Sequence, residues 1–203
     1  MIRSLCLASI AVLALAACQK DEPAAAPEAP APAVAPAAPA PAADPNQLTA
    51  EGLGPVKIGM TAAEVASAWG PDSNPAAVGG AEPAMCDEYH PSRAPEGVNV
   101  MIQEGRLARI SLINAATIKT DRGFGLGDTG LAIKQAYGGA IIAQPAKYEA
   151  APAEDLFSWA HGGSTSYVQD PTARGVRYEI DGDGKVSRIH AGDPAIQLVE
   201  GCS

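Results

Sequence analysis

The side chains able to carry acid–base, nucleophilic or metal chemistry are few in this chain, and they are widely spaced. Its three histidines are His90, His161 and His190, and no two of them stand at the short spacing of a metal-binding pair. Ser164 lies in Gly-Gly-Ser-Thr-Ser, which differs from the Gly-x-Ser-x-Gly of serine hydrolases. We therefore expect no enzyme, no bound metal and no cofactor.

Two glycine-rich stretches resemble ligand loops only in part. Residues 123–128, Gly-Phe-Gly-Leu-Gly-Asp, lack the Gly-x-x-x-x-Gly-Lys-[Ser/Thr] pattern of a phosphate-binding loop. Residues 181–184, Asp-Gly-Asp-Gly, supply too few ligands for a calcium loop. We interpret the first stretch as the start of a helix and the second as a hairpin turn.

The N-terminal residues have the layout of a secretory signal, with Arg3 preceding an apolar run that is too short for a membrane span. The run ends in Leu15-Ala16-Ala17-Cys18, which resembles the lipobox of bacterial lipoproteins. This resemblance implies cleavage before Cys18, acylation of that residue and a lipid anchor in a membrane. Because Gln19 follows, it also implies the outer membrane, with the folded domain facing the periplasm. The alternative is an uncleaved apolar anchor helix.

Residues 19–45 are almost entirely alanine and proline, a composition that favours neither a helix nor a sheet. We interpret them as a semi-extended tether with polyproline II character, and a ligand for a proline-recognition domain is the alternative. The remaining residues are long enough to form one domain with a core. The whole chain has a formal charge of −9, which argues against a nucleic acid as partner.

Cysteine pairing follows from the predicted processing. Cys6 leaves with the signal and Cys18 takes lipid, so Cys86 and Cys202 remain in an oxidising compartment. We expect a disulfide between them, and two buried free thiols are the alternative. In the chain-entropy model such a bond stabilises the fold by about 4–5 kcal/mol.

Two short helices with matching sequences are predicted sixty-eight residues apart, at residues 59–70 and 127–138. Thr61 and Thr129 suit the N-cap positions, and only the first copy has the glutamate, Glu64, of a Thr-x-x-Glu capping box. Each copy then places an apolar stripe on one helix face and ends on a glycine. Helices of this length are marginal alone, so they must pack on a sheet.

Two matching hairpins follow the helices, at residues 97–110 and 175–189. Each alternates apolar and polar residues, as half-buried strands do. Further strands are expected at residues 84–91, 154–161 and 164–169. We therefore predict an α+β fold in which two helix-plus-antiparallel-strand repeats form one sheet with the helices on one face. The predicted parts are a signal peptide (1–17), the acylated cysteine and tether (18–45), a first repeat (46–118), and a second repeat with a C-terminal tail (119–203).

The glycine–threonine start of each helix, followed by a meander of strands, looks like the BamE-like small outer-membrane lipoproteins, and in tandem like the β-lactamase inhibitor protein fold. The tether, Cys86, Pro145 to Tyr148 and the terminal Glu-Gly-Cys are similar to small proteobacterial lipoproteins, some of which are labelled lectins. The resemblance implies helices on one sheet face and a concave binding face on the other. It carries over no inhibitory or ligand-contacting residue.

A binding surface is therefore the main functional expectation. Strand alternation places one set of residues on the solvent-exposed sheet face: Asn99, Met101, Gln103, Arg109, Arg177, Glu179, Arg188 and His190. The candidate binding residues are Arg109, Arg188, Arg177, Glu179 and Tyr89, because arginine offers several donors in a fixed fork. We expect a non-enzymatic, outer-membrane-anchored binding or envelope-assembly lipoprotein with an envelope protein as partner. A carbohydrate- or peptidoglycan-binding module and an inhibitor of a hydrolase are the alternatives.

Overall fold

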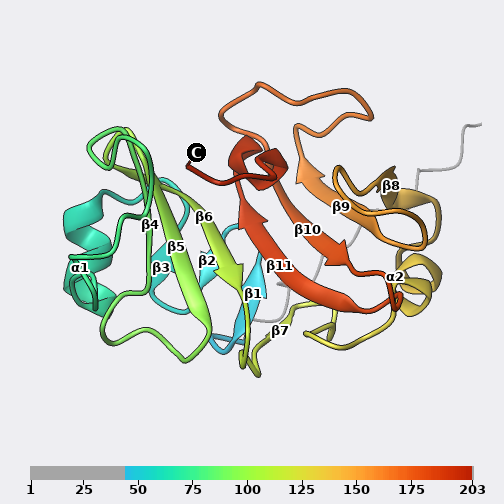
Figure 1. Cartoon of the computed structure of the whole chain (residues 1–203), viewed down its shortest axis with the longest axis horizontal. Coiled ribbons are helices and arrows are strands. Elements are labelled where there is room, and N and C mark those ends of the chain that lie inside the picture. The colour runs from blue at the N-terminus through green and yellow to red at the C-terminus, as the bar shows by residue number, and fades with distance from the viewer. Residues whose placement is uncertain (1–43, 203) are drawn as a thin grey trace, which may run out of the picture. The chain divides into compact units, whose positions relative to one another are not determined.

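The computed structural model describes residues 44–202, and these contain two β-sheets and few helices (Figure 1). The predicted signal peptide, the lipidation site Cys18 and the tether up to residue 43 lie outside the described residues. The fold is mixed α+β, as predicted. The prediction of a single sheet is wrong, because a second, small sheet forms from strands of two or three residues.

The large sheet has seven strands in the order β4-β5-β6-β11-β10-β9-β8, all antiparallel. In chain order these strands are β4 Cys86–Tyr89, β5 Val98–Gln103, β6 Arg106–Leu112, β8 Ile142–Pro145, β9 Glu154–His161, β10 Arg174–Ile180 and β11 Val186–Gly192. The small sheet, in the order β3-β2-β1-β7, contains β1 Gln47–Thr49, β2 Gly52–Leu53, β3 Val56–Lys57 and β7 Lys119–Thr120.

Both predicted helices form, as α1 Ala62–Trp69 and α2 Gly130–Tyr137. Thr61 and Glu64 make the complete capping box, whereas Thr129 caps α2 with a single bond from the backbone N–H of Ala132. Two short 3₁₀ turns complete the helical elements of the described residues, η1 Gly138–Ala140 and η2 Pro194–Gln197.

Both predicted hairpins form, as β5–β6 and β10–β11, and the two hairpins join through antiparallel pairing of β6 with β11. The turn of the first is tight because Glu104 and Gly105 both have positive φ angles, of 49° and 75°. Equivalent backbone hydrogen bonds connect the start of each helix to the second strand of the hairpin that follows it. Gly59 and Met60 bond Leu107, and Gly127 and Asp128 bond Val186.

The predicted strand at residues 164–169 does not form. The side-chain amide of Gln197 instead satisfies the backbone of Val168, accepting from its N–H at 2.9 Å and donating to its carbonyl at 2.9 Å. One side chain thus takes the place of a neighbouring strand. The predicted strands around Cys86 and over residues 154–161 form as β4 and β9.

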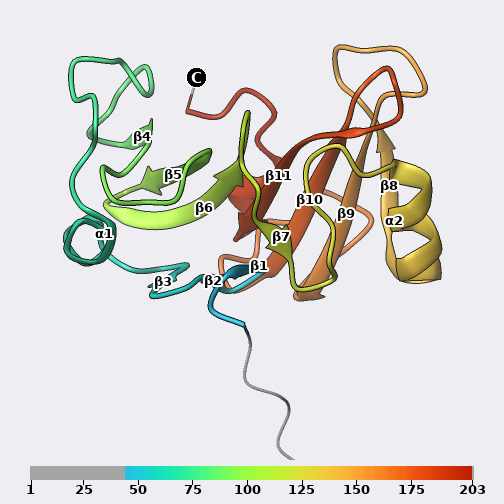
Figure 2. The same cartoon turned by 90° about the horizontal axis from the view of Figure 1, so that it is seen from below.

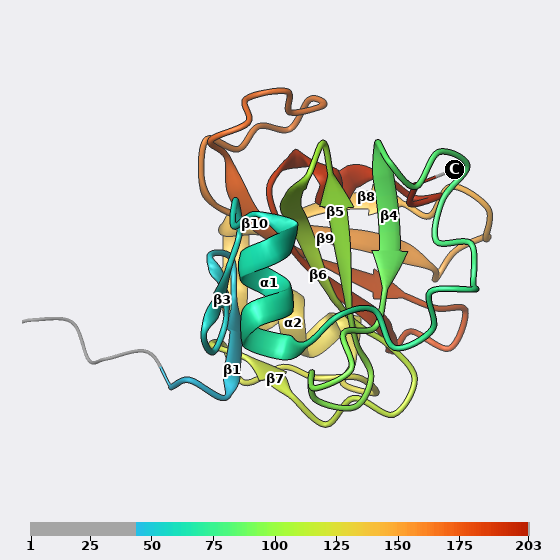
Figure 3. The same cartoon turned by 90° about the vertical axis from the view of Figure 1, so that its left-hand side faces the viewer.

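The two faces of the large sheet differ in what covers them (Figure 2). We call one the core face, because it packs with the small sheet and helices into one apolar cluster that includes Leu48, Val65, Ile110, Ile133 and Tyr178. The other we call the polar face, and the C-terminal segment, residues 193–202, lies across it. Figure 3 shows α1 beside β3 and the C-terminus on the other side of β5.

Candidate functional site

The polar face carries an unusual number of buried charged and polar side chains. They come from the alternating positions of the central strands whose neighbours in sequence fill the core: Arg109 and Ser111 on β6, Asp155 on β9, Arg177 on β10 and His190 on β11. Burying charge is costly unless each group is paired and hydrogen-bonded. These side chains therefore have to satisfy one another.

Arg177 is the centre of one buried network. Its side chain is 2% exposed, and its Nε donates to Oδ1 of Asp155 at 3.0 Å. One terminal nitrogen lies 2.8 Å from Oε1 of Glu179, and the other donates to the backbone carbonyl of Ile196 at 3.1 Å. One guanidinium thus holds two carboxylates and the C-terminal segment together, which suits its fixed fork of donors.

His190 and Ser111 continue this network across the β6–β11 pairing. Nε2 of His190 lies 3.0 Å from Oε1 of Glu179, and Nδ1 lies 2.8 Å from Oγ of Ser111. An ionised carboxylate only accepts hydrogen bonds, so Nε2 carries the proton and donates to Glu179. Nδ1 of the neutral ring is then an acceptor, and the Ser111 hydroxyl donates to it.

The network lowers the pKa values of both His190 and Glu179, which favours the neutral ring and the ionised carboxylate. Burial lowers the pKa of His190 to about 4, despite the opposing hydrogen bond and charge of Glu179. Burial alone would raise the pKa of Glu179, but the hydrogen bond and charge of His190 and the charges of Arg177 and Arg188 outweigh it and lower that pKa to about 2. At neutral pH the ring is neutral and the carboxylate is ionised.

The hydrogen-bond order Ser111–His190–Glu179 is that of a serine–histidine–acid triad. A general base works best when its pKa lies near the working pH. His190 falls well below that range, and Arg177 and Arg188 already compensate the carboxylate that would otherwise stabilise a protonated ring. At neutral pH the three side chains therefore form a fixed set of donors and acceptors.

Stability is expected to depend on pH through His190. The pKa of this ring is about 4 in the folded chain against an ordinary 6.5, so between these values the unfolded chain binds more protons. The free energy of unfolding should therefore rise with pH across that window, by about 3 kcal/mol in total. Urea titrations from pH 4 to 7 measure this, and the difference between the native chain and His190→Gln isolates the contribution of the ring. A His161→Gln control, at an exposed ring, should keep the slope, and an unchanged slope in His190→Gln would contradict the assignment.

Arg109 links the sheet to the C-terminal segment. One of its terminal nitrogens donates to the carbonyls of Ala195 at 3.1 Å and Leu198 at 2.9 Å, and the other pairs with Glu88. Among the described residues its Nε is the one buried side-chain polar atom without a hydrogen-bond partner. Together Arg109 and Arg177 hold three carbonyls of this segment, and the Cys86–Cys202 disulfide fixes its end. The predicted disulfide is confirmed.

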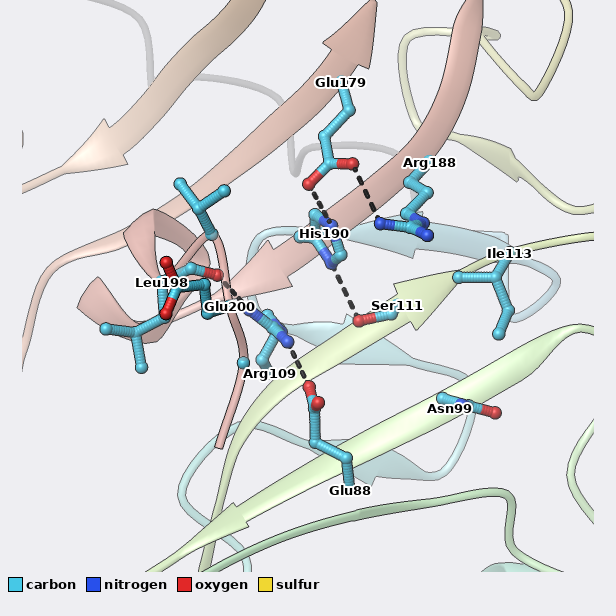
Figure 4. A pocket seen from close by; sticks show the side chains of 12 residues that line it. Glu88, Asn99, Arg109, Ser111, Ile113, Glu179, Arg188, His190, Leu198 and Glu200 are labelled. Atoms are coloured by element: carbon cyan, nitrogen blue, oxygen red, sulfur yellow. Dashed lines mark hydrogen bonds and ion pairs between the residues drawn. The ribbon is translucent and has the colours of Figure 1, made fainter. Parts of the chain in front are cut away.

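A pocket of about 270 Å³ opens on the polar face between the network and the end of the chain (Figure 4). Ser111 and His190 form its floor, and Arg188 and Asn99 stand at its sides. Residues 198–201 form one wall, which we call the pocket wall. Two neighbouring hollows of the polar face also border Arg188 and Glu179, so Arg188 lies where three depressions meet.

The predicted binding residues have different positions in this site. Arg188 lines the pocket with a side chain that is 58% exposed, and Glu179 lies beside it at 3.5 Å. Arg109 and Arg177 lie on the expected face, but they are buried under the C-terminal segment and are not exposed as predicted. Tyr89 packs against the core cluster, on the opposite face, so it cannot belong to the pocket.

The sequence analysis missed the pocket wall and Ile113, and on the strands it missed Glu88 and Ser111, although a signal for Glu88 was present. Cys86 has to face Cys202, so the residue two further along β4 points to the same side and Tyr89 points away. Ser111 has the same parity as Arg109 on β6. It looked like an ordinary strand serine, because its partner His190 lies 79 residues away in the sequence.

Within residues 44–202, no group of three or more His, Cys, Asp or Glu side chains is placed to hold a metal ion. In the same range no helix is both long enough and apolar enough to cross a membrane. No protein-family model, curated protein or solved structure matches the chain. The likeness to the BamE-like lipoproteins and the inhibitor fold therefore stays a prediction.

Proposed function

We propose that the chain is a non-enzymatic, lipid-anchored binding lipoprotein of the bacterial outer membrane, and that its binding site is the polar-face pocket beside Arg188. The observation that carries this proposal is the pocket itself. A buried network of hydrogen bonds and ion pairs fixes its floor, and a disulfide follows its wall directly. Sites held rigidly in this way lose little entropy when a ligand binds.

The low basicity of His190 supports a binding role over a catalytic one. The Ser111 hydroxyl lies in a hydrogen bond to a weak base, and burial leaves that hydroxyl nearly inaccessible, at 5% exposure for the residue. Arg188 is by contrast open, and its ion pair with Glu179 uses one of its nitrogens at 3.5 Å. The accessible donors of the pocket therefore suit recognition.

We also propose that the fold is a duplicated unit with both helices on the core face. Val65 of α1 and Ile133 of α2 belong to the same apolar cluster. The helix starts also contact the two hairpins through equivalent backbone bonds, from Ala62 to Gly105 and from Gly130 to Gly184, each at 3.0 Å. Duplication explains why Arg109 and Arg188 occupy matching strands. In the first copy the arginine holds the C-terminal segment, and in the second it faces the pocket.

The anchor has a direct test. Replacing Cys18 by serine should move the protein from the membrane fraction to the soluble fraction, because no acylated thiol remains to hold it. Cell fractionation with immunoblotting measures this, and Cys6→Ser in the predicted signal peptide is the matched control that should stay with membranes. Retention of the Cys18→Ser chain in the membrane fraction would exclude the lipid anchor.

The pairing of charges in the pocket favours a ligand without net charge, and thus a carbohydrate as the second candidate function. Glu88 pairs with Arg109, Glu179 with Arg177 and Arg188, and Glu200 with Lys147. The remaining donors and acceptors suit hydroxyl groups, which donate and accept at once. Tyr148, 67% exposed near Glu200, adds an apolar ring at the rim.

Arg188 is the residue whose loss should weaken binding most without affecting the fold. We expect Arg188→Ala to reduce binding at least tenfold, because the variant removes the exposed donors of the pocket. Two assays run in parallel, capture from detergent-solubilised membranes and an array of bacterial glycans. A protein that the unmodified chain captures and Arg188→Ala does not would support an envelope partner. A glycan that the unmodified chain binds on the array and Arg188→Ala does not would support the carbohydrate hypothesis.

The control for this experiment is Lys185→Ala, which removes an exposed positive charge at the nearby hairpin turn, outside the pocket. It should bind as the unmodified chain does. Equal binding by all three chains would contradict the assignment of the pocket. A loss in both variants would attribute binding to charge alone.

A further inference from the structure

The pocket wall, residues 198–201, is the last part of the chain before Cys202, and it contributes a third of the pocket lining (Figure 4). The other lining residues come from strands of the sheet or from the short connection after β6. Most of those residues lie in strands that are paired on both sides, and Glu88 lies on the edge strand β4, which pairs with β5. The wall has no strand partner, so the pocket is only as stable as the contacts that hold this segment.

The part of the C-terminal segment before the wall is held firmly. Ile196 is fully buried, and its carbonyl accepts from Arg177. Asp193 caps the turn that starts at Pro194, and Gln197 bonds the backbone of Val168. These contacts do not depend on the end of the chain. They should keep η2 in place whatever happens to the wall.

The wall is held by contacts of a different kind. At its start, the carbonyl of Leu198 accepts from Arg109. Further along, Glu200 contacts Lys147 and Tyr148, both exposed, and exposed ion pairs contribute little to stability. Its end is fixed by the disulfide and by one backbone bond from Ala81 to the carbonyl of Cys202, at 3.2 Å.

The close fit of the wall against β4 depends on the position of its end. A Cβ atom at Gly201 would lie 2.3 Å from a carboxylate oxygen of Glu88, so a larger residue here would displace either the wall or this side chain. Gly201 also has a φ of 67°, which favours glycine. The wall therefore packs closely against Glu88 immediately before the disulfide.

We propose that the Cys86–Cys202 disulfide is a redox latch on the pocket wall, so that its reduction opens the pocket and weakens ligand binding. A dithiol reductant supplies two electrons and two protons, becomes a disulfide itself, and leaves Cys86 and Cys202 as thiols. Cys86 is partly exposed and Cys202 is buried, so the attacking thiolate reaches the bond from the β4 side. The effect on binding rests on the proposed function, whereas the opening of the wall does not.

The opening is measured by nitrogen-15 relaxation on the full mature chain carrying Cys18→Ser, oxidised and reduced with dithiothreitol. The backbone order parameters of residues 199–202 are expected near 0.85 when oxidised and below about 0.6 when reduced, while β5, β6 and η2 stay rigid. Unchanged order in the wall would overturn the proposal. Parallel loss of order in β5 and β6 would overturn it too, since reduction would then unfold the domain.

Two variants separate the latch from other causes. Leu156→Ala empties a fully buried core position with the disulfide intact, so it destabilises the fold without touching the wall. Lys147→Ala removes one of the exposed contacts of Glu200. Both should leave the wall ordered, and a mobile wall in either oxidised variant would show that the disulfide is not what holds it.

The effect on binding uses the same array of bacterial glycans and the same membrane capture, with the reduced and oxidised chains. We expect at least tenfold weaker binding after reduction, and an intermediate loss for oxidised Gly201→Ala, whose added methyl group displaces the wall from Glu88. A mobile wall with undiminished binding would overturn the functional part of the latch. If neither assay gives a signal in the oxidised state, the proposed function fails, and the relaxation data still decide whether the wall opens.

Discussion

Replacing both Cys86 and Cys202 by serine is expected to lower the free energy of unfolding by about 4–5 kcal/mol. The bond joins residues 116 positions apart, so the unfolded chain gains a great deal of freedom when it is lost. It also ties the end of the chain to β4, which is an edge strand of the large sheet. Urea unfolding at pH 7, followed by circular dichroism, measures the difference.

The reduced native chain provides the matched comparison for this variant. It should unfold within about 1 kcal/mol of the serine variant, because both lose the same loop closure and differ only in two sulfur atoms. The free energy of unfolding could instead fall by less than about 1 kcal/mol in both the reduced chain and the serine variant. This would mean that η2 and the hydrogen bonds from Arg109 and Arg177 hold the C-terminal segment without the disulfide. That result would also remove the basis for the redox latch, because the wall would then not depend on the disulfide.

Replacing Arg177 by methionine is expected to destabilise the fold by about 3–5 kcal/mol. Methionine keeps much of the side-chain volume but leaves Asp155 and Glu179 buried without their shared cation. It also leaves the carbonyl of Ile196 without its donor. Urea unfolding at pH 7 measures the change.

Arg188→Met is the control for this prediction, because it removes an arginine from the same carboxylate at the exposed end. Arg188→Met should lower the free energy of unfolding by less than about 1 kcal/mol, since exposed ion pairs contribute little. Adding Glu179→Gln to Arg177→Met should recover part of the stability by removing one of the uncompensated charges. Equal effects of the two arginine replacements would contradict the buried network.

Local sequence signals predicted the elements that later position the site. The capping box at Thr61 and the alternation along β5 and β10 specify a helix and two strands from neighbouring residues alone. The failures came from non-local contacts. Gln197 replaces a strand partner for residues 164–169, and strands as short as β2 and β3 leave no periodic pattern to detect.

The same distinction explains the partial view of the site. The alternation of apolar and polar residues along the strands placed Arg109, Arg177, Glu179 and His190 on one sheet face. Whether their side chains are exposed depended on which segment lies across that face. The C-terminal segment begins more than 80 residues after Arg109 in the sequence. No local pattern therefore reveals that carbonyls of this segment will accept hydrogen bonds from Arg109. The C-terminal segment does not cover Arg188, whose side chain is 58% exposed as the sequence suggested.

Buried charge on the polar face has a clear consequence for function. The donors and acceptors that hold Ser111, His190 and Glu179 in place are already satisfied, so the floor of the pocket should not rearrange when a ligand binds. Discrimination then falls to the accessible groups, Arg188 and Asn99. This rigidity supports the proposed role of the pocket in binding a polar ligand.

Site-specific photo-crosslinking in living cells tests most directly the claim that this pocket is the binding site. A benzophenone amino acid replaces Asn99, which is half-buried beside Ser111, and in a second strain it replaces Leu131, which is 66% exposed on α2. Both chains keep the anchor and the disulfide. We expect an adduct of defined mass from position 99 and none from position 131. An adduct from position 131 with none from position 99 would place the binding surface on the helices and contradict the account.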